Sequence, residues 1–275
     1  MTSHDVVGRC RRVFGQRRVG HGGTLDPDAT GVLLVILGRA TRLVRFLGEL
    51  PKSYAGEVVL GVATSTLDAA GEVTGAWDMA GVGLDDVRRV VAEGFVGAIE
   101  QVPPMVSAVK VGGRRLHELA RAGVEVERKA RPVVVHRFDV SGTGEPGVYR
   151  VEVDCSSGTY IRSLAADVGR ALGGGAHLRA LRRTAIGSFS LDESRPLDEV
   201  GPGDVLAPVE VWRGRPRVEV PAEVAEAVGH GKVLDRPVLG VTGEGPWAVV
   251  DAGGTLLAVY EPYGPAQAKP AVVLI

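Results

Sequence analysis

Residues Arg18 to Gly31 read RVGHGGTLDPDATG. Four glycines, one proline and two aspartates among these fourteen residues rule out the interior of a regular helix or strand. The apolar run Val32–Leu37 follows directly and has the length of a buried strand. We therefore expect a polar, glycine-rich loop held against a buried element, a place where proteins often carry reactive groups.

Local chemistry offers three other interpretations of this loop. It can be a plain tight connection in which Asp26 and Asp28 cap a turn through side-chain hydrogen bonds. A calcium loop is weakly supported, because its twelfth position is Leu37 rather than a bidentate glutamate. A Walker-type phosphate loop fails, because Gly31 is followed by an apolar run instead of Gly-Lys-Ser/Thr.

Further motifs follow the loop in a fixed order. The first is L-G-R-A-T-R at 37–42. The others are Lys52-Ser53-Tyr54, Gln101-Val102-Pro103-Pro104 with Ser107-Ala108-Val109-Lys110, Ala130-Arg131-Pro132, Gly158-Thr159-Tyr160-Ile161-Arg162, and Gly175-Ala176-His177-Leu178 with Leu181-Arg182-Arg183. Together with the loop, they resemble the motifs of the TruB family, the tRNA pseudouridine synthases B, over roughly residues 2 to 190.

The resemblance implies the pseudouridine synthase fold, an α+β fold with a mixed, curved sheet and an RNA-binding cleft. Periodicity predicts helices over 3–14, 38–47, 84–95, 114–121 and 160–172, and strands over 52–62, 132–141 and 148–155. We assign residues 1–212 to the catalytic domain and 213–275 to a small β-rich C-terminal domain. The latter faintly resembles the RNA-binding PUA type; the alternative is a stabilising β appendage without RNA contact.

TruB-like chains carry a strand and an Asp-Lys-Pro segment ahead of the motif at which this chain opens, Thr2-Ser3-His4. We expect that N-terminal strand, and the family lysine within it, to be missing here. An unpaired sheet edge and an open side of the active site would follow.

The resemblance also implies catalytic roles for three residues. Asp26 matches the family nucleophile, and Arg162 matches the arginine that pairs with it. Tyr54 matches the tyrosine that stacks on the target base and helps to remove its C5 proton. The alternative for Arg162 is a surface cation on a helix, and from the residues alone Tyr54 would be a half-buried strand tyrosine.

Three more residues match substrate-binding positions of the family. His21 matches a histidine that stacks near flipped nucleotides, and Tyr160 and Leu181 match positions that line the uracil pocket. Without the resemblance, His21 is a loop histidine, and the other two are ordinary core residues. Because the reaction only moves a glycosidic bond from N1 to C5 of the base, we expect no metal and no organic cofactor.

The distribution of charge indicates a polyanionic partner. The net charge is −1, yet residues 9–45 sum to +6 and residues 110–137 to +5, so the other 210 residues sum to −12. Two basic segments on an otherwise acidic chain are typical of an electrostatic footprint for a polyanion. The candidates for RNA-backbone contacts are Arg18, Lys110, Arg114, Arg115, Arg182 and Arg183.

Composition excludes several other classes. The sequence has neither a signal-peptide pattern nor an apolar run of membrane-spanning length. Its two cysteines, Cys10 and Cys155, lack Cys-x-x-Cys spacing, and no histidines are spaced as metal ligands, which argues against disulfides and zinc. We expect a cytoplasmic protein, without a membrane or protein partner, that acts as a monomer.

The predicted function is therefore isomerisation of the T-loop uridine of tRNA (position 55) to pseudouridine, with an aspartate nucleophile and base flipping. Two rivals belong to other classes. The first is a non-catalytic RNA-binding or tRNA-folding protein. The second is a glycosidase or nucleosidase, which needs a second carboxylate as acid and base where these motifs offer Arg162 and Tyr54.

Overall fold

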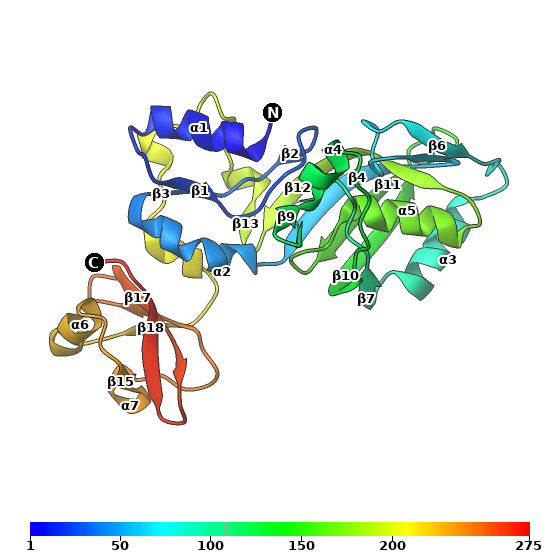
Figure 1. The fold of residues 1–275 in the computed structure, drawn as a ribbon. Coiled ribbons are helices and arrows are strands. Elements are labelled where there is room, and N and C mark those ends of the chain that lie inside the picture. Colours follow the sequence, from blue (N-terminus) through cyan, green and yellow to red (C-terminus); the bar gives the residue numbers. More distant parts are fainter. Residues whose placement is uncertain (108) are drawn as a thin grey trace. The chain divides into compact units, whose positions relative to one another are not determined.

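The computed structural model describes residues 1–107 and 109–275, with the side chains of Lys110, Arg115 and His117 outside the described part. The chain forms two compact units (Figure 1). The sheet unit consists of Leu25–Val32 and Glu49–Ser194, and the terminal unit of Met1–Thr24, Leu33–Gly48 and Arg195–Ile275.

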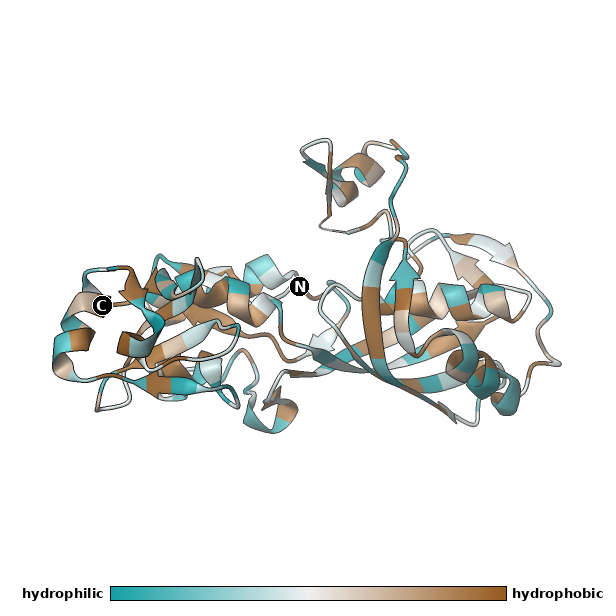
Figure 2. Cartoon of the chain, turned by 90° about the horizontal axis from the view of Figure 1, so that it is seen from below, coloured by the Kyte–Doolittle hydropathy of each residue, from teal (hydrophilic) through white to brown (hydrophobic). Residues whose placement is uncertain are grey.

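A mixed sheet forms the centre of the sheet unit. Its strands follow the order β13-β12-β4-β11-β10-β7, all antiparallel, and β2 pairs parallel with β12. Their bounds are β2 (Thr30–Gly31), β4 (Lys52–Leu60), β7 (Gly97–Gln101), β10 (Arg131–Gly142), β11 (Val148–Cys155), β12 (Ala176–Ile186) and β13 (Phe189–Ser190). Figure 2 shows the curvature of this sheet and the alternation of apolar and polar residues along its long strands. The expected α+β fold with a mixed, curved sheet is confirmed.

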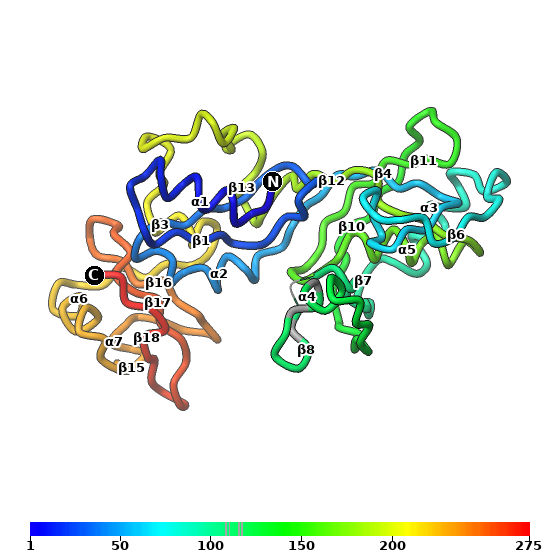
Figure 3. The backbone as a smooth tube through the Cα atoms, turned by 45° about the horizontal axis from the view of Figure 1, so that its top comes forward, coloured from blue at the N-terminus to red at the C-terminus, as the bar shows by residue number. Residues whose placement is uncertain are grey.

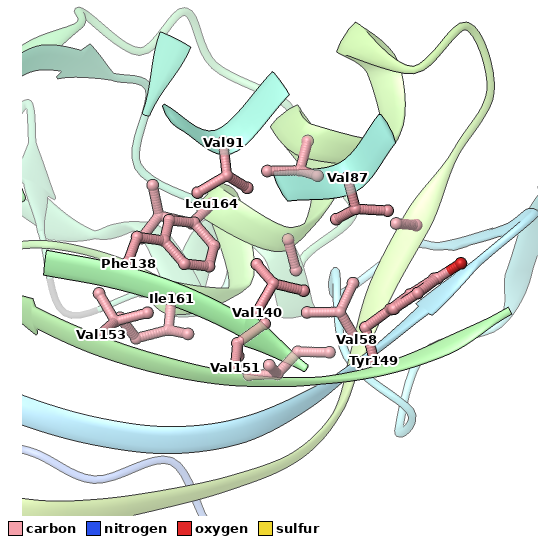
Figure 4. Close-up of a cluster of buried hydrophobic side chains, with 14 of the residues drawn as sticks. Val58, Val87, Val91, Phe138, Val140, Tyr149, Val151, Val153, Ile161 and Leu164 are labelled. Carbon is pink, nitrogen blue, oxygen red and sulfur yellow. The ribbon is translucent and has the colours of Figure 1, made fainter. Parts of the chain in front are cut away.

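Helices α3 (Leu84–Gly94) and α5 (Ile161–Ala171) cover one face of this sheet. Val87 and Val91 lie one turn apart on α3 and face the strands together with Leu164 of α5 (Figure 4). Asp86 starts α3 by accepting a hydrogen bond from the Gly83 amide at 3.1 Å. This apolar contact holds α5 firmly, so residues at its N-terminal end have fixed positions.

The opposite face of the sheet is charged but balanced. Arg137 on β10 forms ion pairs with Asp139, Glu152 and Asp154. Arg179 on β12 likewise binds Glu57. Because these arginines are neutralised by neighbours, this face adds little to the positive charge expected from the sequence.

Smaller elements complete the sheet unit. Beyond β4 the chain turns at Gly61 (φ +85°), so the strand expected over 52–62 ends early and a separate hairpin begins. The chain between β7 and β10 leaves the sheet as an excursion (Figure 3). The bounds are β5 (Val62–Thr64), β6 (Val73–Ala76), β8 (Lys110–Val111), β9 (Arg114–Arg115), α4 (Leu116–Arg121) and the 3₁₀ turn η2 (Leu191–Glu193).

In the terminal unit, α1 (Ser3–Val13) packs beside the antiparallel pair β1 (Val19–His21) and β3 (Val35–Leu37). Val7 and Cys10 of α1 contact Val19 in a small apolar cluster. Thr2 and Asp5 form a capping box that starts the helix. The helix expected over 38–47 is a 3₁₀ turn, η1 (Gly38–Leu43), that continues into α2 (Val44–Gly48).

A β-rich region follows within the same unit. Its sheet has the order β14-β16-β17-β18-β15. The bounds are η3 (Pro202–Asp204), η4 (Pro208–Trp212), β14 (Arg217–Glu219), α6 (Ala222–Gly229), β15 (Leu234–Asp235), α7 (Arg236–Leu239), β16 (Trp247–Val250), β17 (Leu256–Tyr263) and β18 (Gln267–Val273). Since 33–48 and 195–212 belong to the same compact unit as this sheet, the domain boundary near residue 212 stays a prediction.

Three arginines of the first basic segment are used inside the terminal unit. Arg39 donates to the Leu274 carbonyl at 3.3 Å and Arg42 to the Val273 carbonyl at 2.9 Å. Arg45 binds Glu261 at 3.0 Å. This helical stripe therefore fastens η1 and α2 to the end of the C-terminal sheet, and its charge is only partly available to RNA.

Candidate active site

The loop that carries Asp26 is fixed by backbone contacts to β12. Thr30 and Gly31 pair with Arg182 and Arg183, and the Val32 amide donates to the Arg183 carbonyl at 2.8 Å. Gly31 has φ +102°, and a Cβ placed there would lie 2.1 Å from the Arg183 carbonyl oxygen. Only glycine permits this close approach. The expected glycine-rich loop is thus observed, but it is held against β12. The apolar run Val32–Leu37 is mostly half-buried, and β3 takes up only its last three residues, so the expected buried strand is not formed there.

Asp26 and Arg162 form a bidentate ion pair. Nε of Arg162 lies 2.9 Å from Oδ2 of Asp26, and Nη2 lies 3.0 Å from Oδ1. The Arg162 side chain is 4% exposed, whereas the Asp26 side chain is 39% exposed. The buried Arg162 cation therefore binds both oxygens of the Asp26 carboxylate, and part of the carboxylate stays accessible to a substrate.

The remaining guanidinium hydrogens of Arg162 also have acceptors. Nη1 donates to the Thr66 carbonyl and Nη2 to the Val106 carbonyl, each at 2.9 Å. Nη1 lies 3.4 Å from Oδ2 of Asp68. All five N–H groups of the guanidinium are thus engaged, which fixes its plane and direction.

The start of α5 is clamped by a buried side-chain amide. Gln101 is 2% exposed and binds Tyr160 twice, accepting from its amide at 3.0 Å and donating to its carbonyl at 3.2 Å. Ser163 donates to the Val102 carbonyl at 3.2 Å. Because Tyr160 is the N-cap of α5, these bonds set the position of Arg162, the second residue of the helix.

Asp68 is a second carboxylate in this cluster. Its Oδ1 accepts from Thr66 Oγ1 at 2.5 Å and from the Ala70 amide at 3.1 Å, while Oδ2 faces Arg162. Leu67, between Thr66 and Asp68, has φ +63°, a conformation that non-glycine residues rarely adopt. This turn is held against β12, where the Leu178 amide donates to the Leu67 carbonyl at 3.0 Å.

Electrostatics act in opposite directions on Asp26. Burial raises the pKa of its carboxyl, and the negative charge of Asp68 raises it further, while Arg162 lowers it. Burial has the largest effect, so the pKa of Asp26 lies above its ordinary value. A carboxylate with a raised pKa is a stronger base and nucleophile than an exposed one.

Tyr54 and Leu181 lie on adjacent central strands. Tyr54 is on β4 and Leu181 on β12, and both are half-buried against the core under α5. Burial raises the pKa of the Tyr54 phenol, Arg183 opposes this, and Asp26 adds to it. The structure thus brings four of the expected site residues, Asp26, Tyr54, Arg162 and Tyr160, into one region of the sheet unit.

The structure places the other expected residues differently. Arg18, Arg114 and Arg182 are exposed, as phosphate contacts must be, whereas the side chains of Lys110 and Arg115 lie outside the described residues. His21 belongs to β1 of the terminal unit and accepts from the Gly23 amide at 3.4 Å through Nδ1.

Arg183 contradicts the expectation of a surface phosphate contact. It is 1% exposed, and its Nε donates to the Val32 carbonyl at 2.8 Å. The physical reason is its place on a central strand, where its side chain lies on the face that carries Tyr54.

Sequence reasoning assigned no role to Asp68, Thr66 or Gln101. Asp68 and Thr66 stand in a polar, glycine-rich connection where a carboxylate is commonplace. Gln101 belongs to one of the quoted motifs, but its contact with Tyr160 depends on the fold. The one signal available in the sequence was its place in a motif, close to the Pro103-Pro104 pair.

Other parts of the described chain offer weaker sites. A cavity of about 450 Å³ lies in the terminal unit, lined among others by Trp212, Arg215 and Trp247. Arg215 covers the Trp212 ring, and no cluster of carboxylates, histidines or cysteines able to hold a metal occurs among the described residues. None of the described helices is both long and apolar enough to span a membrane.

Comparisons with known proteins identify the family of this chain. The model of the TruB family pseudouridylate synthase N-terminal domain matches residues 11–161, and models of two TruB C-terminal domains match 162–210 and 216–275. The chain belongs to the TruB family. It is accordingly a pseudouridine synthase, as the sequence motifs predicted, and its match to a TruB C-terminal domain over 216–275 is consistent with the small PUA-like region expected there.

TruB relatives match along nearly the whole chain. The tRNA pseudouridine synthase B of Mycobacteroides abscessus is 48% identical over 94% of this chain and 88% of its own length. That of Mycobacterium tuberculosis is 43% identical over 99% of this chain and 92% of its own. Among solved structures, a chain of a Cbf5-Nop10-Gar1 complex matches with a TM-score of 0.76 and 27% identity, covering 100% of this chain and 82% of that one.

Proposed function

We propose that this TruB-family enzyme converts the T-loop uridine of tRNA to pseudouridine and that Asp26 is its nucleophile. The observation that carries the proposal is the bidentate pair between Asp26 and the buried Arg162. A partly exposed carboxylate with a raised pKa, oriented by a fixed cation, suits attack on an electron-poor carbon of the nucleotide.

The reaction breaks the N1–C1′ bond, turns the base and joins C5 to C1′. Asp26 would first add to the sugar or the base and would leave again before the reaction ends. It must therefore be ionised at the start, and its carboxylate must be stable enough to act as a leaving group at the end. Arg162 meets both needs, because it favours the carboxylate and stays charged throughout. Tyr54, Leu181 and Tyr160 would contact the uracil.

Access to the uridine requires base flipping. Extruding a nucleotide from a folded loop costs roughly a few kcal/mol, which stacking on aromatic side chains partly offsets. Tyr54 would stack on the target base and His21 on a neighbouring nucleotide. The exposed Arg18, Arg114 and Arg182 would bind phosphates, so affinity should fall steeply with salt.

The test is incubation of an unmodified tRNA transcript with the enzyme, followed by chemical mapping of pseudouridine. We expect one T-loop signal with the wild type and none with Asp26→Asn, while tRNA affinity remains nearly intact. Asp28→Asn is the matched control, because this exposed aspartate lies in the same loop two residues away. Turnover by Asp26→Asn would overturn the nucleophile assignment.

The same assay separates the rival classes. A non-catalytic RNA-binding protein would bind the transcript without any signal. A glycosidase would release free uracil and leave an abasic site. A signal outside the T-loop would retain the enzyme class and refute the substrate position.

A further inference from the structure

Arg183 is a buried cation that the proposed reaction has so far left unused. It lies on β12 in register with Tyr54 on the antiparallel strand β4. Residues directly opposite each other in such a pair place their side chains on the same face. Arg183 therefore shares the face of the sheet on which the uracil would stack.

Two contacts hold the Arg183 side chain. Nε donates to the Val32 carbonyl at 2.8 Å, and the side chain forms a hydrogen bond with that of Tyr54. A guanidinium that is 1% exposed is costly to bury unless its charge and its N–H groups are compensated. The Tyr54 phenol oxygen is a compensating group, and its anionic form compensates better than its neutral form.

The charged groups around this pair act in opposite directions. Tyr54 experiences Arg183, which favours the phenolate, and Asp26 and Cys155, which disfavour it. Arg183 in turn has Lys52 as a second buried cation nearby. Tyr54 is thus influenced by one buried cation with a second cation beside it, and by the negative charge of the proposed nucleophile.

We propose that Arg183 is a positioning residue that holds the Tyr54 hydroxyl and stabilises its phenolate, so that Tyr54 accepts the C5 proton in the last step of pseudouridine formation. This inference rests on the proposed function and adds a residue to it. Arg183 itself touches neither the sugar nor the base.

The proton balance of that step is simple. Once C5 is bonded to C1′, it still carries its hydrogen. The C5–H electron pair forms the C5–C6 double bond of pseudouridine while C6 releases either Asp26 or, where it is doubly bonded to N1, that electron pair to N1. N1 takes up a proton, and the C5 proton passes to the phenolate oxygen. The neutral phenol then returns the proton to solvent, and nothing is oxidised or reduced.

The charges around Tyr54 at the moment of proton transfer favour its role as the base. Burial raises the pKa of the Tyr54 phenol and Arg183 lowers it, so the cation counters the largest obstacle to ionisation. If Asp26 adds to C6 of the uracil, it stays bonded there until the C5 proton leaves, so its negative charge is absent at that step. The group that disfavours the phenolate is then neutral, whereas Arg183 keeps its charge.

The first test is a double-mutant cycle with Arg183→Met and Tyr54→Phe, measured as single-turnover rates on tRNA. Arg183→Met should lower the rate about ten- to a hundredfold, the range of one charge-assisted hydrogen bond, with tRNA affinity changed less than twofold. In the Tyr54→Phe background the same change should have no further effect. Equal losses in both backgrounds would overturn the proposal. Arg179→Met is the matched control on β12, because Arg179 is partly exposed and paired with Glu57.

The second test separates charge from anchoring, because Arg183 also binds the Val32 carbonyl. Arg183→Lys keeps the charge but loses the planar fork, whereas Arg183→Met loses both. If Arg183 stabilises the phenolate, the rate of Arg183→Met should rise with pH more steeply than those of the wild type and Arg183→Lys. Identical pH profiles of the two variants would indicate a purely structural anchor and refute the role.

The third test is chemical rescue with tRNA tritiated at C5 of uridine. A fluorinated tyrosine at position 54, whose phenol is more acidic, should restore tritium release by Arg183→Met at least tenfold. Absence of rescue would overturn the inference. A wild type that releases no tritium at all would instead refute the proposed function, so the two failures are distinguishable.

Discussion

The Asp68 carboxylate lies 3.4 Å from Nη1 of Arg162, so that one buried guanidinium serves two carboxylates. Asp26 takes two of its N–H groups and Asp68 faces a third. Because the cation is shared, Asp26 is neutralised less completely than in an isolated pair, and its carboxylate keeps more of its basicity.

Asp68→Asn should therefore weaken the nucleophile. We expect the plateau rate to fall on the order of tenfold, because a less basic carboxylate is a poorer nucleophile. The acid limb of the pH–rate profile should move to lower pH, since the charge of Asp68 raises the pKa of Asp26. Asp78→Asn is the control: this exposed aspartate makes the same turn contact, accepting from Ala80 at 3.1 Å. An acid limb that moves upward would contradict this account.

Arg162→Lys should abolish most activity without loss of charge. A lysine cannot bind both oxygens of Asp26 and also reach the Thr66 and Val106 carbonyls. We expect single-turnover rates to fall a hundredfold or more, with tRNA affinity little changed. Arg170→Lys is matched, because Arg170 lies on the same helix with a 67% exposed side chain. Comparable losses in the two variants would show that helix stability, not the ion pair, is being measured.

Gly31→Ala should detach the Asp26 loop from β12. The added Cβ would lie 2.1 Å from the Arg183 carbonyl oxygen, and backbone at φ +102° cannot relieve the clash. We expect a loss of roughly 2–4 kcal/mol in the free energy of unfolding, together with loss of turnover. Gly158→Ala is the control, because Gly158 has φ +85° but open space around it. The free energy of unfolding should then fall only by the cost of a positive φ for alanine, about 1 kcal/mol. Equal effects would refute the steric argument.

Lys52 should make stability depend on pH in a distinctive direction. It is buried, and burial together with Arg183 lowers the pKa of its ammonium from 10.5 to about 8. Above about pH 8 the unfolded chain binds more protons than the folded one, so stability rises with pH. The free energy of unfolding of the wild type minus that of Lys52→Met should rise by about 1 kcal/mol between about pH 7.5 and 9. Chemical denaturation of both proteins at each pH measures this difference.

The cysteines do not obscure this result. Burial raises the pKa values of Cys10 and Cys155, which lowers stability as pH rises, but both cysteines are present in the two proteins being compared. The contribution of Cys10 cancels in the difference. Cys155 is coupled to Lys52, and loss of that cation raises the pKa of the Cys155 thiol further, which makes the variant less stable at high pH and so adds to the expected rise. A difference that stays constant with pH would show that Lys52 titrates as an exposed lysine.

The elements with strong local patterns were predictable from the sequence. The apolar periods of α1, α3 and α5 and the alternation in β10 and β11 put their bounds within about two residues of those observed. β12 was not predicted as a strand. Its alanines, leucines and arginines favour helix locally, and pairing with β4, β2 and β13 overrides that preference.

The site was predictable only where motifs carried it. The pairing of Asp26 with Arg162 followed from the family resemblance, and the structure brings the two together across 136 residues. Asp68 reaches Arg162 through a turn in which Leu67 has a positive φ. No local sequence pattern predicts this turn. We expected Arg183 on the surface, where arginines are usually found. The sequence could not show that Arg183 pairs with Tyr54, because Tyr54 lies on a different strand.

The carbonyl of Val106 has a consequence for substrate binding. Nη2 of Arg162 divides its hydrogens between that carbonyl and Asp26. RNA that displaces the Val106 carbonyl on docking would take away the acceptor of this Nη2 hydrogen and so weaken the support of the cation behind Asp26 by about one hydrogen bond, or ~1 kcal/mol. Such linkage is reciprocal, so protonation of Asp26 alters the energy of the docked loop. In that case the pH dependence of tRNA affinity and that of the chemical step would share one origin.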